Sequence, residues 1–443
     1  MPQIGDSIGA NSAAETARWA TSRQSWYTVA LLSLLYVMSL IDRNILALLA
    51  QPVAQSLGLD DRQMALLLGL GFALLYAIGG LFLGHFVDTR NRRIVATVGI
   101  LLWSAATILS AFATTFWSML LLRSGVALGE AVLMPTTISL IADLFPPKAR
   151  GLPVAMFTSV GSFMTIGSYA AGAAAIDLAS TASPILGISV WQTTLVIVGL
   201  PGLVLALLFA ITATVPQRLH KGGDAASTVS MTAVLSHIKN RIRFLGPLLS
   251  LTGINCIYSL AIVTWLPTVL IREHHMTAAN AGYLIGVIGV PAGVGGNFFW
   301  QWVAGRMQHR DPARGLLRPL VVAALLTAPC YAAGLLAHSA NMKVMAFGCG
   351  LFLSTAFNLI TPLAVQSYTS PHMRARIVSV NFLIIAVLGF GLGPLAAVEI
   401  GALLSSGVEG LRYGLIALSL LTWPVVVVVT LATVRNADAP MEQ

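Results

Sequence analysis

The strongest constraint on the fold of this chain is a series of apolar runs, each long enough to cross a membrane. A helix needs about 20 such residues to span the hydrocarbon core of a bilayer. Charged residues make up 9% of the 443 residues, whereas soluble domains carry roughly 25%. The short alternating segments of a membrane barrel are not seen. The sequence therefore predicts an all-α membrane protein.

Twelve such runs can be placed along the chain. They lie at residues 26–54, 62–87, 94–115, 117–143, 151–178, 190–214, 244–271, 278–305, 316–338, 341–368, 375–403 and 411–434. One long polar insert separates the first six runs from the last six. We expect a tail, a six-helix bundle, a linker, a second six-helix bundle and a short tail, at residues 1–25, 26–214, 215–243, 244–434 and 435–443. Two such halves are typical of secondary transporters that expose a central site to each side in turn.

The basic residues alternate in agreement with this count. If both termini are cytoplasmic, 19 of the 25 Lys and Arg residues fall in cytoplasmic segments and four in outer segments. This is the asymmetry of the positive-inside rule, so we expect both tails and the linker in the cytoplasm. The net charge of +9 then reflects membrane topology and does not indicate nucleic-acid binding. No Asn-x-Ser/Thr sequon occurs, which favours a bacterial inner membrane.

Four charged residues lie deep within the first and fourth predicted spans. Asp42 and Arg43 are adjacent in the stretch SLIDRNILALL, and Arg123 and Glu130 are seven residues apart in the fourth span. A separation of seven places two side chains on one face of a helix. Each charge at the centre of a membrane helix costs about 2.5–3.5 kcal/mol and marks a candidate functional site. Charges in such surroundings must be paired or neutralised.

The loop after the second span, GHFVDTRNRR at residues 84–93, combines a small residue, an acid four positions later and a basic cluster. This pattern is similar to the loop signature of the major facilitator superfamily. The glycine permits close helix approach, and the acid can pair with a helix N-terminus or an arginine across the seam between halves. The alternative is an ordinary basic cytoplasmic loop. The motif supplies four candidate gating residues: Gly84, Asp88, Arg92 and Arg93.

Asp143 and Arg150 flank the cytoplasmic end of the fourth span in LIADLFPPKARG, and both are also candidate gating residues. We expect Asp143 to pair with Arg150 or with the Arg374 and Arg376 pair. Two further acids, Asp177 and Glu399, are expected near the outer ends of spans five and eleven, where water can solvate them.

Four stretches of the sequence together resemble the Spinster family of the major facilitator superfamily. They are DRNILALL, GEA, LIADLFPPKARG and SPHMRARIVSVNFLIIAVLGFGLGP. The resemblance runs over nearly all the spans. It implies twelve transmembrane helices in two six-helix bundles, and proton-coupled transport of a lysophospholipid or a sphingosine-1-phosphate-like lipid. The organic-anion symporters share the Asp-Arg pair and the Arg…Gly-Glu-Ala pattern, but they tend to continue with a WFP…ERA loop. Import of a small organic anion is therefore the alternative.

The superfamily fold implies that Asp42 and Arg43 reach Arg123 and Glu130, which gives a net-neutral cluster. We expect Asp42 and Glu130 to carry protons and Arg43 and Arg123 to switch partners; the alternative is a permanent structural salt bridge. One proton crossing 100 mV gains about 2.3 kcal/mol, which is enough to bias states that differ by a few kcal/mol. Protons are the expected coupling ion, with no cofactor or metal, in a monomer.

Polar, aromatic and Met side chains in mid-span are candidates for the substrate cavity. They are Tyr36, Ser39, Phe72, Tyr76, Met134, Thr137, Asn255, Tyr258, Trp265, Phe357 and Asn358. A lining that mixes aromatics and Met with a few polar groups suits an amphiphile. The alternative for each residue is a contact between packed helices. The sequence contains no HExxH, GxSxG or Walker loop, so we predict no enzyme. A channel or a sensor of the same fold is the other class to exclude.

Overall fold

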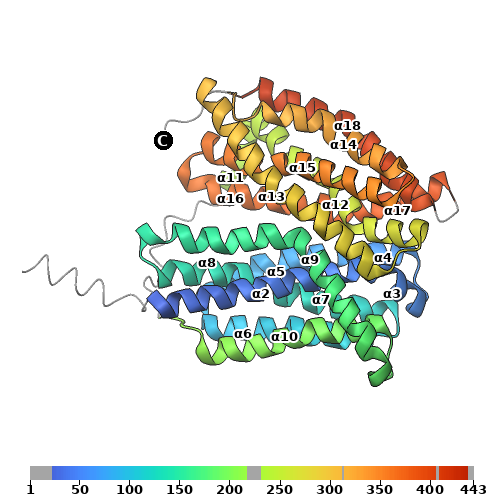
Figure 1. Ribbon diagram of the computed structural model, residues 1–443. Coiled ribbons are helices and arrows are strands. Elements are labelled where there is room, and N and C mark those ends of the chain that lie inside the picture. The colour runs from blue at the N-terminus through green and yellow to red at the C-terminus, as the bar shows by residue number, and fades with distance from the viewer. Residues whose placement is uncertain (1–21, 217–230, 312–313, 406–408, 438–443) are drawn as a thin grey trace, which may run out of the picture.

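The computed structural model describes residues 22–216, 231–311, 314–405 and 409–437. Within these residues the chain forms helices and no strand, and twelve helical segments are long and apolar enough to cross a membrane. They pack as two bundles, the first half in blue to green and the second half in yellow to red (Figure 1). The predicted fold class, twelve transmembrane helices in two bundles of six, is confirmed.

The first bundle contains α2 (Ser22–Leu48), α3 (Ala50–Leu57), α4 (Asp61–Leu68), α5 (Leu70–Thr89), α6 (Arg92–Ser110), α7 (Phe116–Glu130), α8 (Leu133–Leu144), a 3-10 turn (Pro147–Ala149), α9 (Gly151–Leu186) and α10 (Val190–Thr212). The second half contains α11 (Met231–Asn240), α12 (Ile242–His274), α13 (Ala278–Arg310), α14 (Pro319–Leu336), α15 (Ala340–Tyr368), α16 (Pro371–Ile384), the π-helix η2 (Ile385–Leu392), α17 (Gly393–Leu404) and α18 (Gly410–Arg435). Helix α11 lies in the segment that we expected to be a polar linker.

Several membrane spans are interrupted. Helices α4 and α5 are separated at Gly69, α7 and α8 at Ala131 and Val132, and the eleventh span contains the π-helix η2. Irregular backbone at membrane depth is tolerated only where protein or water, and not lipid, surrounds it. Glu130 is the last residue of α7, so the break in the fourth span lies beside one of the charged candidates.

Local sequence explains the short helices at one end of the first bundle. Gly58 adopts a positive φ of 64°, which ends α3 with a left-handed residue. Asp60 then begins α4 as its N-cap, because its carboxylate accepts from the backbone N–H of Gln63 at 2.7 Å and the Gln63 side chain accepts from the Asp60 N–H. We call this region the α3–α4 end. The first residue of α2 and the last of α18 lie at the opposite end (Figure 1).

The two halves share a core at the α3–α4 end. One cluster of buried side chains joins Leu48 and Val53 of the first half to Ile285 and Val398 of the second. A second cluster, which runs from Val29 to Ala213, contains first-half residues alone within the described chain. The halves are therefore tightly packed at one end of the molecule.

Glycines bring α13 close to α9 across this seam. A Cβ atom on Gly286 would lie 2.6 Å from the Cβ of Ala170, and one on Gly289 would lie 2.5 Å from a methyl of Ile166. Small residues at such spacing allow helix backbones to approach in a membrane, where no hydrophobic effect drives helices together.

Polar contacts also join the halves at the α3–α4 end. Arg272 donates to both carboxylate oxygens of Asp61 at 2.8 and 2.6 Å and to Gln51 at 2.8 Å. Arg62 pairs with Glu399 at 2.6 Å. Asp177 accepts from the Tyr283 hydroxyl at 2.9 Å. Asp177 and Glu399, which we expected to be solvated at helix ends, each bind the other half.

Candidate functional site

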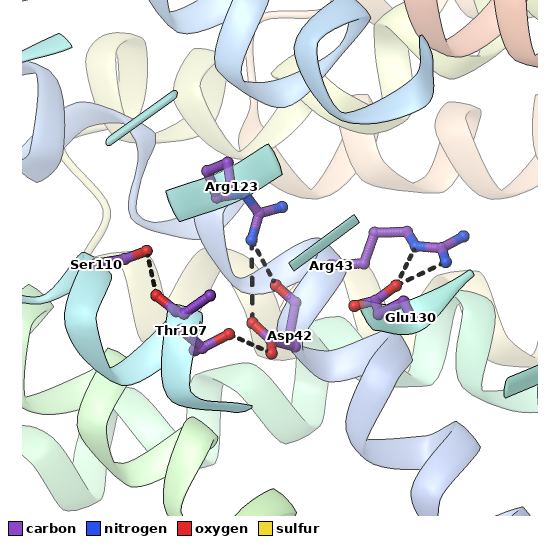
Figure 2. Close-up of polar contacts among 7 residues, drawn as sticks. Asp42, Arg43, Thr107, Ser110, Arg123 and Glu130 are labelled. Atoms are coloured by element: carbon purple, nitrogen blue, oxygen red, sulfur yellow. Dashed lines mark hydrogen bonds and ion pairs between the residues drawn. The ribbon is translucent and has the colours of Figure 1, made fainter. Parts of the chain in front are cut away.

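The four charged candidates come together between α2 and α7 (Figure 2). Arg43 donates to Glu130 Oε2 from Nη2 at 2.8 Å and from Nε at 3.3 Å. Arg123 Nη1 lies 3.9 Å from Asp42 Oδ1 and 3.4 Å from the Asp42 backbone oxygen. The structure therefore forms two ion pairs, and each joins α2 to α7.

The two pairs differ in their access to the surroundings. Asp42 and Arg123 are buried, with 2% and 4% of their side chains exposed, whereas 20% of the Arg43 side chain is exposed. Adjacent residues on a helix point about 100° apart, because one turn takes 3.6 residues. Asp42 therefore turns toward α6, and Arg43 turns toward α5.

Aromatic rings of α5 cover both arginines. The Arg43 guanidinium lies 4.5 Å from the ring centroid of Tyr76 and 5.1 Å from that of Phe72, and Arg123 lies 5.2 Å from the same Phe72 ring. Such cation–π contacts stabilise by roughly 0.5–2 kcal/mol, most where water is excluded. Phe72 thus contacts both cations and links the two ion pairs.

Hydrogen bonding in the cluster is incomplete. Asp42 Oδ1, Glu130 Oε1 and Arg123 Nε are buried without a hydrogen-bond partner within the described chain. Asp42 Oδ2 accepts from the Thr107 hydroxyl of α6 at 2.5 Å. Sequence reasoning missed Thr107, because one threonine in an apolar span carries no signal of its own. The two carboxylate oxygens without a hydrogen-bond partner can each accept a proton or a new donor, and Arg123 Nε can donate to a new acceptor.

The predicted cavity residues of the first half fall into two groups. Tyr36, Tyr76 and Met134 are partly exposed, and Tyr36 stacks on Phe157 with ring centroids 4.8 Å apart. Ser39, Phe72 and Thr137 are buried at 2%, 5% and 0% exposure. The Thr137 hydroxyl bonds to the Leu133 carbonyl of its own helix. Ser39 and Thr137 are therefore packed between helices in this structure, Phe72 faces the arginines, and their place in a substrate cavity stays a prediction.

Most of the second-half candidates are also packed inside their bundle. The Tyr258 hydroxyl donates to Asn255 Oδ1 at 2.6 Å, and Asn255 donates to Ser354 at 3.0 Å. Trp265 donates to the Pro394 carbonyl at 3.1 Å. Their exposed fractions are 0–1%, and Phe357 is equally buried. These four residues are therefore packed among helices in this structure, with the Asn255 and Trp265 side chains bonded to α15 and α17, and their place in a substrate cavity stays a prediction.

Asn358 differs from these four, because its side chain is exposed. It is the one second-half candidate whose position agrees with a cavity lining.

Among the gating candidates, Asp143 has a different partner from the one expected. It pairs with Arg92 at 2.5 Å. Arg150 instead donates to the Ala142 and Phe145 carbonyls at 2.6 and 3.1 Å, because the last carbonyls of α8 need donors.

Arg374 likewise donates to the Thr369 carbonyl, with the same five-residue offset in the second half. Arg93 donates to the Ala210 and Ala213 carbonyls at 3.1 and 2.7 Å. The surroundings of Gly84 and the side chain of Asp88 lie outside what the structure describes.

Two six-helix bundles with a paired charge cluster inside one of them define the architecture of a membrane transporter. The chain belongs to the Major Facilitator Superfamily, whose family model matches residues 32–435. It is therefore a transporter and not an enzyme, in agreement with the sequence analysis.

Its relatives include two bacterial transporters and one mouse transporter. An MFS-type efflux pump of Mycolicibacterium smegmatis is 28% identical over 84% of this chain and 83% of its own length. A probable L-galactonate transporter of Escherichia coli is 24% identical over 77% of this chain and 70% of its own. The mouse sphingosine-1-phosphate transporter SPNS2 is 30% identical over 38% of this chain and 32% of its own.

The fold is similar to two solved structures of a bacterial homologue of the human lysosomal transporter Spinster. These structures, inward-facing in the unoccupied and the occupied state, are 22% and 24% identical to this chain. Each gives a TM-score of 0.81 and covers 95% of this chain and 100% of its own. The predicted resemblance to Spinster proteins is confirmed.

Proposed function

We propose that this protein is a proton-coupled secondary active transporter of an amphiphilic, lipid-like substrate of the lysophospholipid or sphingolipid type. It works by alternating access. The observation that carries the proposal is the pair of α2–α7 ion pairs, in which Arg43 bonds Glu130 at 2.8 Å and Arg123 lies 3.9 Å from Asp42. Asp42 and Glu130 are the proton carriers, and the two arginines are their switching partners.

The incomplete bonding of the cluster supports proton coupling. Within the described residues, each acid keeps one buried carboxylate oxygen that has no hydrogen-bond partner. That oxygen can receive a proton. Protonation of Glu130 removes the charge that holds Arg43, which remains stacked on Phe72 and Tyr76. An uncompensated buried cation costs several kcal/mol, so Arg43 then attracts a new anion. A substrate headgroup is such an anion.

The surroundings of Arg43 support an amphiphile. Its partly exposed guanidinium provides one charged point beside the rings of Tyr36 and Tyr76 and the flexible side chain of Met134. Few polar groups among aromatic and apolar ones suit a ligand with a charged head and a hydrocarbon tail. The name of the mouse SPNS2 relative, a sphingosine-1-phosphate transporter, agrees with this class.

Proton-coupled import of a small organic anion is the second candidate. The L-galactonate relative favours it, because a guanidinium also binds a carboxylate with two parallel hydrogen bonds. The two candidates differ in what surrounds the anion: a sugar acid needs hydroxyl partners around it, and the lipid needs apolar walls.

Purified protein in vesicles tests both candidates. Uptake of a labelled lysophospholipid and of labelled galactonate is measured directly. A pH-sensitive dye inside the vesicles reports proton movement at the same time. We expect proton movement with the lysophospholipid, and its loss in Asp42→Asn and Glu130→Gln. Glu409→Gln removes a carboxylate that pairs with Arg412 within the second half and is the matched control. Substrate flux without proton movement indicates a channel, and a full pH response in both cluster variants contradicts proton coupling.

We further propose a monomer in the bacterial inner membrane, with both termini in the cytoplasm. The domain boundaries proposed are tails at 1–25 and 435–443, bundles at 26–214 and 244–434, and a linker at 215–243. In this orientation the packed α3–α4 end faces outward. The basic residues of the loops support this orientation.

A further inference from the structure

Thr107 of α6 contacts one member of the charged cluster from outside the α2–α7 pair. Its hydroxyl donates to Asp42 Oδ2 at 2.5 Å, and its side chain is 1% exposed (Figure 2). We propose that Thr107 is a positioning residue that sets the pH at which Asp42 exchanges its proton. This rests on the proposed role of Asp42 as a proton carrier.

A hydroxyl can satisfy both protonation states of the acid. When Asp42 is ionised, the Thr107 O–H donates to it, as the structure shows. When Asp42 carries a proton, its own O–H donates to the Thr107 oxygen, which has free lone pairs. The Thr107 hydrogen then turns to the carbonyl four residues earlier, that of Trp103, in the usual back-bond of a helical threonine.

Neighbouring side chains already make this back-bond. Ser110, on the same helix, donates to the Ala106 carbonyl at 2.7 Å (Figure 2), and Thr137 donates to the Leu133 carbonyl at 2.8 Å. The exchange therefore moves the Thr107 hydrogen to a type of acceptor that these side chains already use. It leaves neither the proton nor the carboxyl oxygen Oδ2 without a partner in low-dielectric surroundings, where an unpaired polar group is costly.

The charged groups that face Asp42 are few. They are Arg123 and Glu130 of α7 and its neighbour Arg43. Helices α8 and α9 also pack on α2 and carry one acid each, but Asp143 is paired with Arg92 and Asp177 is bonded to Tyr283. Helix α10 has no ionisable residue. Helices α12 and α13 also contact α2; the one acid of α12, Glu273, is paired with Lys343, and α13 carries no acid.

The two acids are held differently. Glu130 receives two hydrogen bonds from a cation, whereas Arg123 stays 3.9 Å from the Asp42 carboxylate. The neutral Thr107 therefore makes the one short contact to Asp42 among the described residues. Its loss affects the ionised acid most, because a hydrogen bond to a charged group is stronger than one between neutral groups.

Three variants and two readouts test the assignment. Thr107→Val keeps the shape and removes the hydroxyl, Thr107→Ser keeps the hydroxyl, and Thr107→Ala removes it without β-branching, in case the valine variant fails to fold. Thr268→Val is the matched control, since Thr268 is equally buried and its hydroxyl has no partner in the described chain. The readouts are the pH profile of transport and the infrared carbonyl band of protonated Asp42, identified by its loss in Asp42→Asn.

We expect the midpoint of the Asp42 band to move up by about one to two pH units in Thr107→Val and Thr107→Ala. The transport profile moves with it, whereas Thr107→Ser and Thr268→Val stay near wild type. An unmoved band midpoint in the variants without the hydroxyl overturns the proposal, as does an equal shift in Thr107→Ser. If the band moves while wild-type transport ignores pH, proton coupling fails and the assignment of Thr107 stands.

Discussion

Removal of the Asp61 carboxylate tests whether the ion pairs at the α3–α4 end hold the two halves in the described state. Arg272 donates to both oxygens of Asp61, and these side chains are 18% and 30% exposed. Their exposure lies between that of surface pairs, which contribute about 0–1 kcal/mol, and that of buried pairs, whose disruption costs about 3–5 kcal/mol. We therefore expect Asp61→Asn to weaken the closed end by about 1–2 kcal/mol, roughly a 5- to 30-fold change in the population ratio.

Spin labels at positions 90 and 310, near the opposite end, measure that ratio, with the three native cysteines replaced. Opening at the α3–α4 end brings the labelled ends together, so Asp61→Asn should enrich the shorter distances. The double exchange Asp61→Arg with Arg272→Asp should restore the wild-type distribution.

Glu409→Gln is the control for this measurement, because Glu409 pairs with Arg412 within the second half. If Asp61→Asn leaves the distance distribution unchanged, or if Glu409→Gln shifts it equally, the ion pair does not hold the halves together.

Three further predictions concern the cluster, the seam and the second bundle. Arg43→Lys keeps the charge but loses the two-donor fork and the ring stacking, so we expect at least ~10-fold slower transport at normal thermal stability; an unchanged rate contradicts this. Gly286→Val places an isopropyl group where α9 packs and should destabilise by about 1–3 kcal/mol in thermal unfolding, whereas Gly295→Val, with no atom within 4 Å of its Cβ, should not. Lys343→Met removes a buried cation, 1% exposed, that lies 3.1 Å from Glu273, and should cost about 3 kcal/mol in the same assay; a cost under about 1 kcal/mol refutes the buried pair.

The sequence by itself determined the number of spans, their division into two halves and the identity of the four charged candidates. Span count follows from length, because a helix of about 20 apolar residues is the shortest that crosses a bilayer. The charges of Asp42, Arg43, Arg123 and Glu130 stand out because each is expensive at that depth. Their positions in the first and fourth spans determined which helices carry them, and the seven-residue spacing predicted that Arg123 and Glu130 share one face.

Only the tertiary structure decided which partner each polar group has. Arg43 bonds Glu130, while Asp42 accepts a hydrogen bond from Thr107. Asp143 pairs with Arg92 and not with Arg150, which is nearer in sequence. Helix periodicity gives the face of a residue but not the helix that faces it.

The burial of the cavity candidates could not be predicted from the sequence for a related reason. Asn255 and Tyr258 have the same appearance in sequence whether they line a cavity or bond each other, because both situations supply the non-lipid partner that a polar group needs inside a membrane. Packing of helices distant in sequence chooses between the two, and here it buried both side chains at 0% exposure.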